Sequence, residues 1–487
     1  MRAAFESGQL SSVELTTTHL ARIAEVDPEI CAFTEVTRDD ALRSATRLDD
    51  ERRSGENCGP LHGVPVTLDE CFDLAGRATT LGLVSRQGAV ATKDSDLARA
   101  LRSAGAVILG RTNLSQLLLS PESDNPVFGR TSNPFSPRHA GGGGAAAVAA
   151  GLTPLAFCSD QRVSAHFCGV AAFVPSLGRL LNRDRFGRTS LLARNVADIE
   201  VGLDALPAAA LASIDARIPP FVDAPAPALR GLTVGVLHDS GVIPPSSALI
   251  GALERAGDAL RAVGVRVEPV AVADLDELFF AAFELLLADG GRAMIDALVD
   301  ESVTESLRSL HKLVRVPRAV RAGLERIAKL SGDKESARVI AGIGEKTATE
   351  LQALEDKVDS IRRAMLEAWQ KSGLAAILCP PYATPAVTHG GSAELLVASS
   401  YSLPWTAVGL PAGVVPVTRV HGAEARRDRA RGQVGRLARR IDEQSAGLPV
   451  GVQMVAPPWR DRTLLSLMDA VERNVRADVD YPRTPVW

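Results

Sequence analysis

The glycine run from Gly141 to Gly144 is the first candidate for chemistry, because it leads directly into an alanine-rich segment that is expected to be helical. Backbone N–H groups at the start of a helix are good hydrogen-bond donors to an anion. The Gly-Lys-Ser/Thr ending of a phosphate-binding P-loop is missing, and no Gly-x-Gly-x-x-Gly follows a strand together with an acidic partner. A nucleotide site is therefore not favoured. The alternative is a loop in which glycines let two backbones pack closely.

The flanking segments alternate between helical and strand patterns. Ser11 and Glu14 have the spacing of a capping box, and apolar residues follow at helical offsets through residue 26. Further helices are expected over 38–53, 95–104, 247–263, 278–288 and 345–372, and strands near 66 and over 106–109, 232–237, 265–270, 374–379 and 448–456. This alternation predicts an α/β fold.

Composition excludes several classes of protein. The chain of 487 residues has a formal net charge of −4 and only 4% aromatic residues, which argues against nucleic-acid binding. Six scattered cysteines contain no C-x-x-C pair and the N-terminus has no apolar segment, so we expect a cytoplasmic protein without disulfides. The most apolar stretch, 278–288, is too short to cross a bilayer and contains Glu284, so no transmembrane segment is expected.

Two segments are strongly basic. Residues 312–329 combine six basic side chains with apolar residues at helical spacing, which predicts one amphipathic helix. Residues 419–440 contain eight arginines and are expected to form a surface insertion. Either segment is suited to contact an anionic membrane or partner, and the alternative is an ordinary solvated face.

Several motifs together resemble the amidase signature family. They are Gly59-Pro-Leu-His-Gly-Val-Pro-Val66, Asp124-Asn-Pro-Val-Phe-Gly129, Phe167-Cys-Gly169 and Gly447-Leu-Pro-Val-Gly-Val-Gln453. The fatty acid amide hydrolase branch is the more similar one, through Val66-Thr-Leu-Asp-Glu-Cys-Phe72, Asp289-Gly-Gly-Arg292, Leu410-Pro-Ala-Gly-Val-Val-Pro-Val-Thr418 and Pro458-Trp459.

The resemblance implies the fold. It runs in the family's order over nearly the whole chain, so residues 1–487 are expected to form one domain. This domain would consist of an N-terminal helical segment (1–58), a signature core (59–230) and a C-terminal part (231–487). Its α/β architecture would be a large twisted, mixed and mostly parallel sheet of about eleven strands covered by helices, as the family has.

The family's catalytic residues are not found at their matching positions. The family hydrolyses amides with a Ser–Ser–Lys triad and a Gly-Gly-Ser turn that holds the oxyanion. Here Asp69 stands at the lysine position, and Gly141 or a gap replaces the second serine. The family's nucleophile motif matches Ser159-Asp-Gln-Arg-Val163, with about four residues missing between Asp160 and Gln161. The missing segment would carry both the nucleophile and the oxyanion turn.

Other residues near the shortened loops are candidates for the remodelled pocket. The resemblance places nine of them there: Asp69, Glu70, Gly141, Gly142, Gly143, Asp160, Arg162, Ser164 and His166. A new Ser–His–Asp set is one alternative, since Ser164 and His166 would share a face if they lay on a strand. A metal bound by the carboxylates with His139 and His166 is less favoured, because no metal-ligand spacing is present. A satisfied polar cluster is the plain alternative.

We therefore expect a pseudoenzyme with the amidase fold and a binding or regulatory role. The alternatives are an enzyme of altered chemistry, or an amide or ester hydrolase acting on a small acyl compound. The partners expected are a small acyl or amide ligand and a second chain, either a copy of this one or an active relative, and no cofactor or metal. The branch's membrane-binding cap matches about 310–342, which here is basic and only modestly apolar, so at most weak attraction to anionic surfaces is expected.

Overall fold

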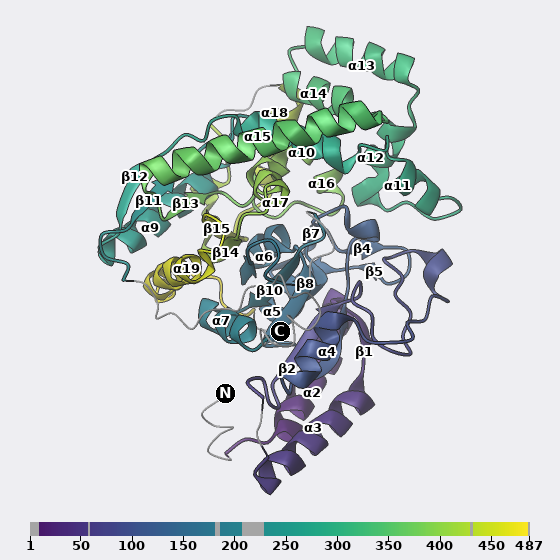
Figure 1. Ribbon diagram of the computed structural model, residues 1–487, viewed down its shortest axis with the longest axis vertical. Coiled ribbons are helices and arrows are strands. Elements are labelled where there is room, and N and C mark those ends of the chain that lie inside the picture. Colours follow the sequence, from purple (N-terminus) through teal and green to yellow (C-terminus); the bar gives the residue numbers. More distant parts are fainter. Residues whose placement is uncertain (1–8, 57–58, 181–185, 207–227, 429–431, 486–487) are drawn as a thin grey trace. The chain divides into compact units, whose positions relative to one another are not determined.

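The computed structural model describes all residues except 1–8, 57–58, 181–185, 207–227, 429–431 and 486–487 (Figure 1). The chain divides into two compact units. The first unit comprises residues 1–183, 187–225 and 483–487, and the second comprises residues 184–186 and 226–482. Eleven strands are assigned to the large mixed sheet that the resemblance implied, six in the first unit and five in the second.

In the first unit the strand order is β1-β3-β2-β8-β10-β9. The strand β2 is parallel to β3 and β8, whereas β1, β10 and β9 pair antiparallel to their neighbours. The six strands are β1 (Phe33–Val36), β2 (Pro65–Asp69), β3 (Val107–Thr112), β8 (Leu155–Ser159), β9 (Ala171–Val174) and β10 (Thr189–Ala193). Short ribbons are formed by β4 (Asp124–Asn125) with β5 (Gly129–Arg130), and by β6 (Ser132–Asn133) with β7 (Ser136–Ala140).

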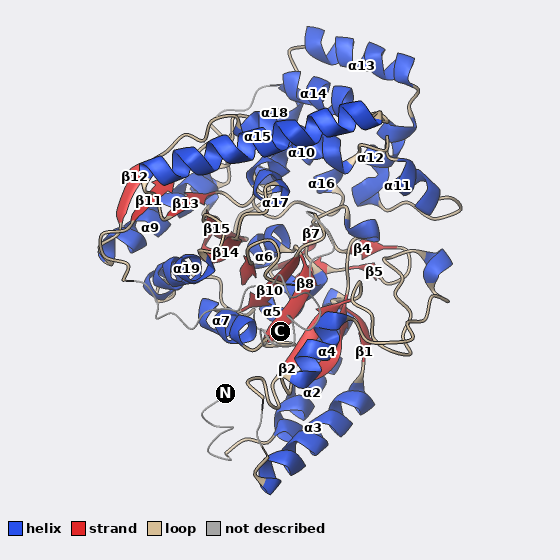
Figure 2. Ribbon diagram, viewed as in Figure 1, coloured by secondary structure: helices blue, strands red, loops and turns tan. Residues whose placement is uncertain are grey.

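Helices pack on this half of the sheet (Figure 2). They are α2 (Ser12–Ile30), α3 (Arg38–Ser54), α4 (Asp96–Ser103), α5 (Gly143–Ala149), α6 (Arg162–Cys168) and α7 (Val196–Asp204), with the 3-10 turns η1 (Val84–Arg86) and η2 (Gln116–Leu118). The expected capping box is confirmed, since the Ser11 hydroxyl accepts from Glu14 N–H at 3.1 Å and Glu14 accepts from Ser11 N–H at 2.9 Å.

In the second unit the strand order is β14-β15-β13-β11-β12. The strand β11 is parallel to β12 and β13, and β15 is antiparallel to β13 and β14. These strands are β11 (Thr233–Val236), β12 (Arg266–Pro269), β13 (Ala376–Cys379), β14 (Ala412–Arg419) and β15 (Pro449–Val455). The sheet is mixed as expected, and its parallel share is smaller than the resemblance implied.

The second unit is richer in helices, and the longest one, α15, is visible as the bright green ribbon of Figure 1. Its helices are α9 (Ser247–Ala262), α10 (Leu275–Leu286), α11 (Arg292–Ala297), α12 (Glu305–Arg315), α13 (Arg318–Leu330), α14 (Lys334–Gly342), α15 (Ala348–Ser372), α16 (Gly391–Glu394), α17 (Leu403–Ala407), α18 (Gly432–Glu443) and α19 (Asp461–Val475), with 3-10 turns η3 (Leu396–Tyr401) and η4 (Gly422–Glu424).

The basic segment 312–329 is two helices and not one. The helix α12 ends at Arg315, Pro317 is the N-cap of α13, and α13 has no buried residue. Proline lacks a backbone N–H and disfavours helical geometry in the residue before it, which explains the break. Among the described residues, no helix is both long and apolar enough to cross a membrane.

The arginine-rich segment 419–440, of which residues 429–431 lie outside the described residues, is only partly a surface feature, which corrects the expectation that it lies at the surface. Its start belongs to β14, and Arg427 and Asp442 are each only 1% exposed and form an ion pair at 2.9 Å. Arg427 also donates to the carbonyl oxygen of Ala383 at 2.8 Å. A buried arginine needs these partners, so this side chain anchors the segment and is not available to a membrane or partner.

Candidate functional site

Asp69 is the centre of a buried polar cluster in the first unit. Its side chain is fully buried at the C-terminal end of β2. One carboxylate oxygen accepts from the Thr112 hydroxyl at 2.8 Å, and the other accepts from Ser159 N–H at 2.9 Å and from the Ser159 hydroxyl at 2.8 Å. The Gln161 amide donates to both oxygens, at 3.0 and 2.9 Å. Each of these partners donates, so this site is built to hold a carboxylate.

The pKa of Asp69 is raised to about 6, because the effect of burial is larger than the opposite effect of the hydrogen bonds from Thr112 and Ser159. The raised value means that folding favours the protonated form of this group. Its contribution to stability is fully present below the unfolded pKa of 3.8 and is lost as the pH rises through about 6. At neutral pH Asp69 is therefore a buried anion held by neutral donors.

Asp69→Asn is expected to change the pH dependence of stability. As the pH rises from 4 to 7, the stability difference between the two proteins should shift in favour of the asparagine variant. The reason is that only the native chain ionises a buried group in this range. The gain is up to about 3 kcal/mol for a shift of this size, or about 3 °C in the thermal midpoint of a chain of 487 residues. Midpoints of both proteins across this pH range measure it.

The control for this measurement is Asp50→Asn, at a carboxylate that is 61% exposed on α3. Its midpoint should differ from the native value by no more than about 1 °C at every pH, because exposed ion pairs contribute little. If the difference in thermal midpoint between Asp69→Asn and the native chain is the same at every pH from 4 to 7, Asp69 does not become a buried anion in this range.

Gln161 connects Asp69 to the glycine loop. Its amide oxygen accepts from the backbone N–H of Ala145 at 3.3 Å, near the start of α5. The N–H of Gly143 donates to the Ser123 hydroxyl at 2.9 Å. Two of the donors that could bind an external anion at this turn, the N–H groups of Gly143 and Ala145, therefore already have acceptors from the protein.

The glycine loop packs tightly, which decides between the two alternatives of the sequence analysis. A Cβ atom would lie 2.5 Å from the Ser164 Cβ if placed on Gly142, and 2.2 Å from the Cys158 sulfur if placed on Gly144. On Gly143 it would lie 2.1 Å from the carbonyl oxygen of Asn113, whereas Gly141 is less crowded, with 3.0 Å to a backbone oxygen. A larger residue would have to displace backbone atoms at position 143 and packed side chains at positions 142 and 144.

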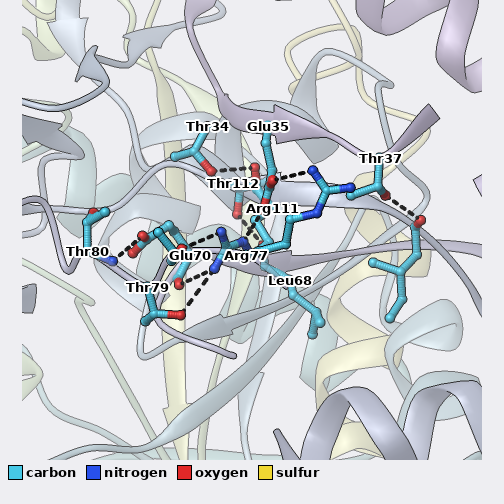
Figure 3. A network of polar contacts seen from close by, with 12 residues as sticks. Thr34, Glu35, Thr37, Leu68, Glu70, Arg77, Thr79, Thr80, Arg111 and Thr112 are labelled. Atoms are coloured by element: carbon cyan, nitrogen blue, oxygen red, sulfur yellow. Dashed lines mark hydrogen bonds and ion pairs between the residues drawn. The ribbon is translucent and has the colours of Figure 1, made fainter. Parts of the chain in front are cut away.

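Glu70 belongs to a different network, which holds the loop after β2 (Figure 3). Its carboxylate accepts from the backbone N–H groups of Thr80 at 2.5 Å and Leu81 at 3.1 Å. The buried Arg111 donates to the carbonyl oxygens of Glu70 at 3.2 Å and Ala78 at 2.6 Å, and it pairs with Glu35. Glu70 and Arg111 therefore hold the backbone beside Asp69 in place, and their role is structural.

Asp160, whose side chain is 17% exposed, pairs with the buried Arg162 at the start of α6. The guanidinium donates to the two carboxylate oxygens at 2.9 and 2.7 Å. Burial would raise the pKa of Asp160, but the charges and hydrogen bonds of Arg162 and the charge of Arg188 outweigh it and lower the pKa. Asp160 is therefore held as a carboxylate by Arg162.

Ser164 and His166 do not meet the condition under which they would share a face, because they do not lie on a strand. Both lie in α6, where a separation of two residues places side chains on different faces. The Ser164 hydroxyl donates to the carbonyl oxygen of Pro121 at 2.7 Å, and His166 is fully buried. In the described part of the chain, no group of three or more histidine, cysteine, aspartate or glutamate residues is placed to hold a metal.

Four residues with contacts in this part of the site were not predicted as functional candidates: Thr112, Ser123, Ser159 and Gln161. Their residue types are common, and their partners are distant in sequence, as in the separation of 92 residues between Gln161 and Asp69. The one local signal is that Ser159 and Gln161 flank Asp160, after which the resemblance predicts a missing segment.

Comparison with known proteins agrees with the fold. The profile described as Amidase matches residues 14–465. Fatty-acid amide hydrolase 1 of Sus scrofa is 30% identical over 446 residues, which cover 85% of this chain and 76% of the relative. A glutamyl-tRNA(Gln) amidotransferase subunit from Streptomyces avermitilis is 27% identical, over 96% of this chain and 92% of the relative.

Solved structures show the same architecture. A fatty acid amide hydrolase superposes with a TM-score of 0.85 at 20% identity, covering 98% of this chain and 84% of the other. A native peptide amidase from Stenotrophomonas maltophilia superposes with a TM-score of 0.70 at 24% identity, covering 100% and 98%. At these identities the structural likeness establishes the fold alone.

Proposed function

The chain belongs to the amidase signature family, and we propose that it is a member that no longer hydrolyses amides and keeps the fold for a binding or regulatory role. The observation that carries this proposal is the Asp69 cluster. Asp69 matches the family's catalytic lysine, and each of its contacts is one that a protonated lysine would have to break or reverse. The triad and oxyanion turn are, on this proposal, replaced by a buried structural network.

The backbone donors support the same proposal. Amide hydrolysis needs N–H groups aimed at the developing oxyanion. Here the N–H groups of Gly143, Ala145 and Ser159 donate to Ser123, Gln161 and Asp69. A substrate carbonyl would have to displace side chains of the protein itself to reach these donors.

A second candidate function rests on Ser159. Its hydroxyl donates to Asp69 at 2.8 Å, and the side chain is partly exposed, so Asp69 could act as a general base for a serine nucleophile. Relatives carry the names of a hydrolase and of an amidotransferase subunit. An enzyme of altered chemistry, or an amide or ester hydrolase acting on a small acyl compound, is therefore the alternative.

The expected partners follow from the retained fold. We propose a small acyl or amide ligand, together with a second chain that is either a copy of this one or an active relative. The name of one relative describes it as a subunit, which supports the idea of pairing. We also propose a cytoplasmic location, as expected from the scattered cysteines.

A fluorophosphonate probe tests the proposal, because it forms a covalent bond only with an activated serine. We expect no labelling of the native protein under conditions that fully label an active amidase used as a positive control. Mass spectrometry after digestion would locate any label that forms.

Two serine variants distinguish the candidates if labelling does occur. Ser159→Ala should abolish the label if Ser159 is the nucleophile, whereas Ser164→Ala removes a buried hydroxyl bonded to Pro121 and should leave it in place. Stoichiometric labelling that disappears only in Ser159→Ala would reject the pseudoenzyme and support the second candidate.

A further inference from the structure

A pocket of about 250 Å³ lies in the second unit, between residues 270–274 and the C-terminal half of α15. Its deepest lining comes from core side chains, and Trp369 is only 5% exposed. Four alanines also line it, two in the 270–274 segment and two that are one helical turn apart on α15. These lining residues are Met365, Trp369, Leu374 and Ile377 from the core, with Ala271, Ala273, Ala364 and Ala368.

The size and lining of this pocket suit a small apolar body. A cavity of about 150 Å³ with apolar walls is large enough for benzene, so this pocket has room for a bicyclic aromatic ring system. Trp369 offers an aromatic surface, and Met365 adapts readily to the shape of a ligand. The Trp369 ring nitrogen is not available for a ligand, because it donates to the carbonyl oxygen of Leu374 at 2.8 Å.

Asp274 gives the pocket its charge. It is the N-cap of α10, yet its backbone is left-handed, with φ 56° and ψ 22°, and its side chain does not cap the helix. The nearby Asp276 and Glu277 are paired with Arg338, at 3.1 and 2.6 Å. Asp274 is an exposed residue of the lining, and no hydrogen bond or ion pair joins its carboxylate to another described residue, so its negative charge lies at the rim of the pocket and is open to solvent.

We propose that this pocket binds a small aromatic ammonium compound, with its apolar body against Met365 and Trp369 and its cationic group at Asp274. Ligand sites of this type combine an apolar lining with a few placed polar groups. The proposal is independent of amide hydrolysis, because its residues belong to the second unit and the Asp69 cluster belongs to the first.

The test compares three naphthalene probes of similar shape by isothermal titration calorimetry. We expect 2-(1-naphthyl)ethylammonium to bind saturably at one site. The neutral 2-(1-naphthyl)ethanol should bind about 5-fold more weakly, as an ion pair at the rim of a pocket allows, and 3-(1-naphthyl)propionate should bind more weakly still. Asp274→Asn should remove the advantage of the ammonium probe over the alcohol.

Filling the pocket tests its location. Ala368→Phe should abolish binding of all three probes, whereas Ala353→Phe, at an exposed alanine earlier on the same helix, should leave binding unchanged. Ala364→Leu serves the same purpose if Ala368→Phe does not fold. The proposal is overturned if no probe binds saturably, if the propionate binds as tightly as the ammonium compound, or if binding survives in the filled variants.

Discussion

The purified protein should hydrolyse oleamide on the order of 10⁶-fold more slowly than an active fatty acid amide hydrolase assayed beside it. The expectation follows from the pseudoenzyme proposal. Loss of one member of a catalytic triad costs about as much as loss of all of them, because the members act as a unit. The Asp69 cluster offers no lysine, and the N–H groups of Gly143 and Ala145 are already bonded.

The assay needs a control for residual activity from contaminants. Ser159→Ala is suitable, because any turnover that persists in it cannot come from the one serine that contacts Asp69. A short ester substrate should be tested in parallel, since esters react more easily than amides. Turnover within about 10³-fold of the active relative, lost in Ser159→Ala, would contradict the prediction and assign catalysis to Ser159.

The elements of the fold were predictable where short-range spacing determines them. The capping box of Ser11 and Glu14 depends on residues three apart, and both of its hydrogen bonds are present. The long helix α15 follows from helical spacing in the same way. The prediction of a single helix over 312–329 was wrong. The helical spacing of apolar residues continues through Pro317, but a helical backbone is interrupted there.

The candidate site was predictable only in part, because its partners come from distant segments. Asp69 and the glycine run could be identified from their motifs, but the residues that satisfy them could not. Gln161 lies 92 residues from Asp69, and Ser123 lies 20 residues from Gly143. The alternative of a Ser164–His166 pair depended on a strand, whereas these residues belong to the helix α6. Likewise, the many arginines of 419–440 gave no indication that one of them, Arg427, is buried in an ion pair with Asp442.

Asp69→Lys should destabilise the protein strongly and should not restore amide hydrolysis. The lysine would be fully buried and would face the NH2 group of Gln161 and the N–H of Ser159, which only donate, together with the hydroxyls of Ser159 and Thr112. A buried charge without a partner costs about 3–5 kcal/mol, which corresponds to a fall of about 3–5 °C in the thermal midpoint of a chain of this length. Differential scanning calorimetry and the oleamide assay measure the two outcomes.

A second substitution makes the reason for this loss testable. In Asp69→Lys/Gln161→Glu the new carboxylate can accept from the lysine and still accept from the Ala145 N–H, as the Gln161 amide oxygen does now. The double variant should therefore recover about half of the lost midpoint, since an opposite charge stabilises a buried ion most when it is adjacent. The single variant Gln161→Glu should instead be destabilised, because it places two carboxylates side by side. A lysine at position 69 that leaves stability unchanged, or that restores turnover on its own, would mean that the cluster around Asp69 still accommodates the family's chemistry.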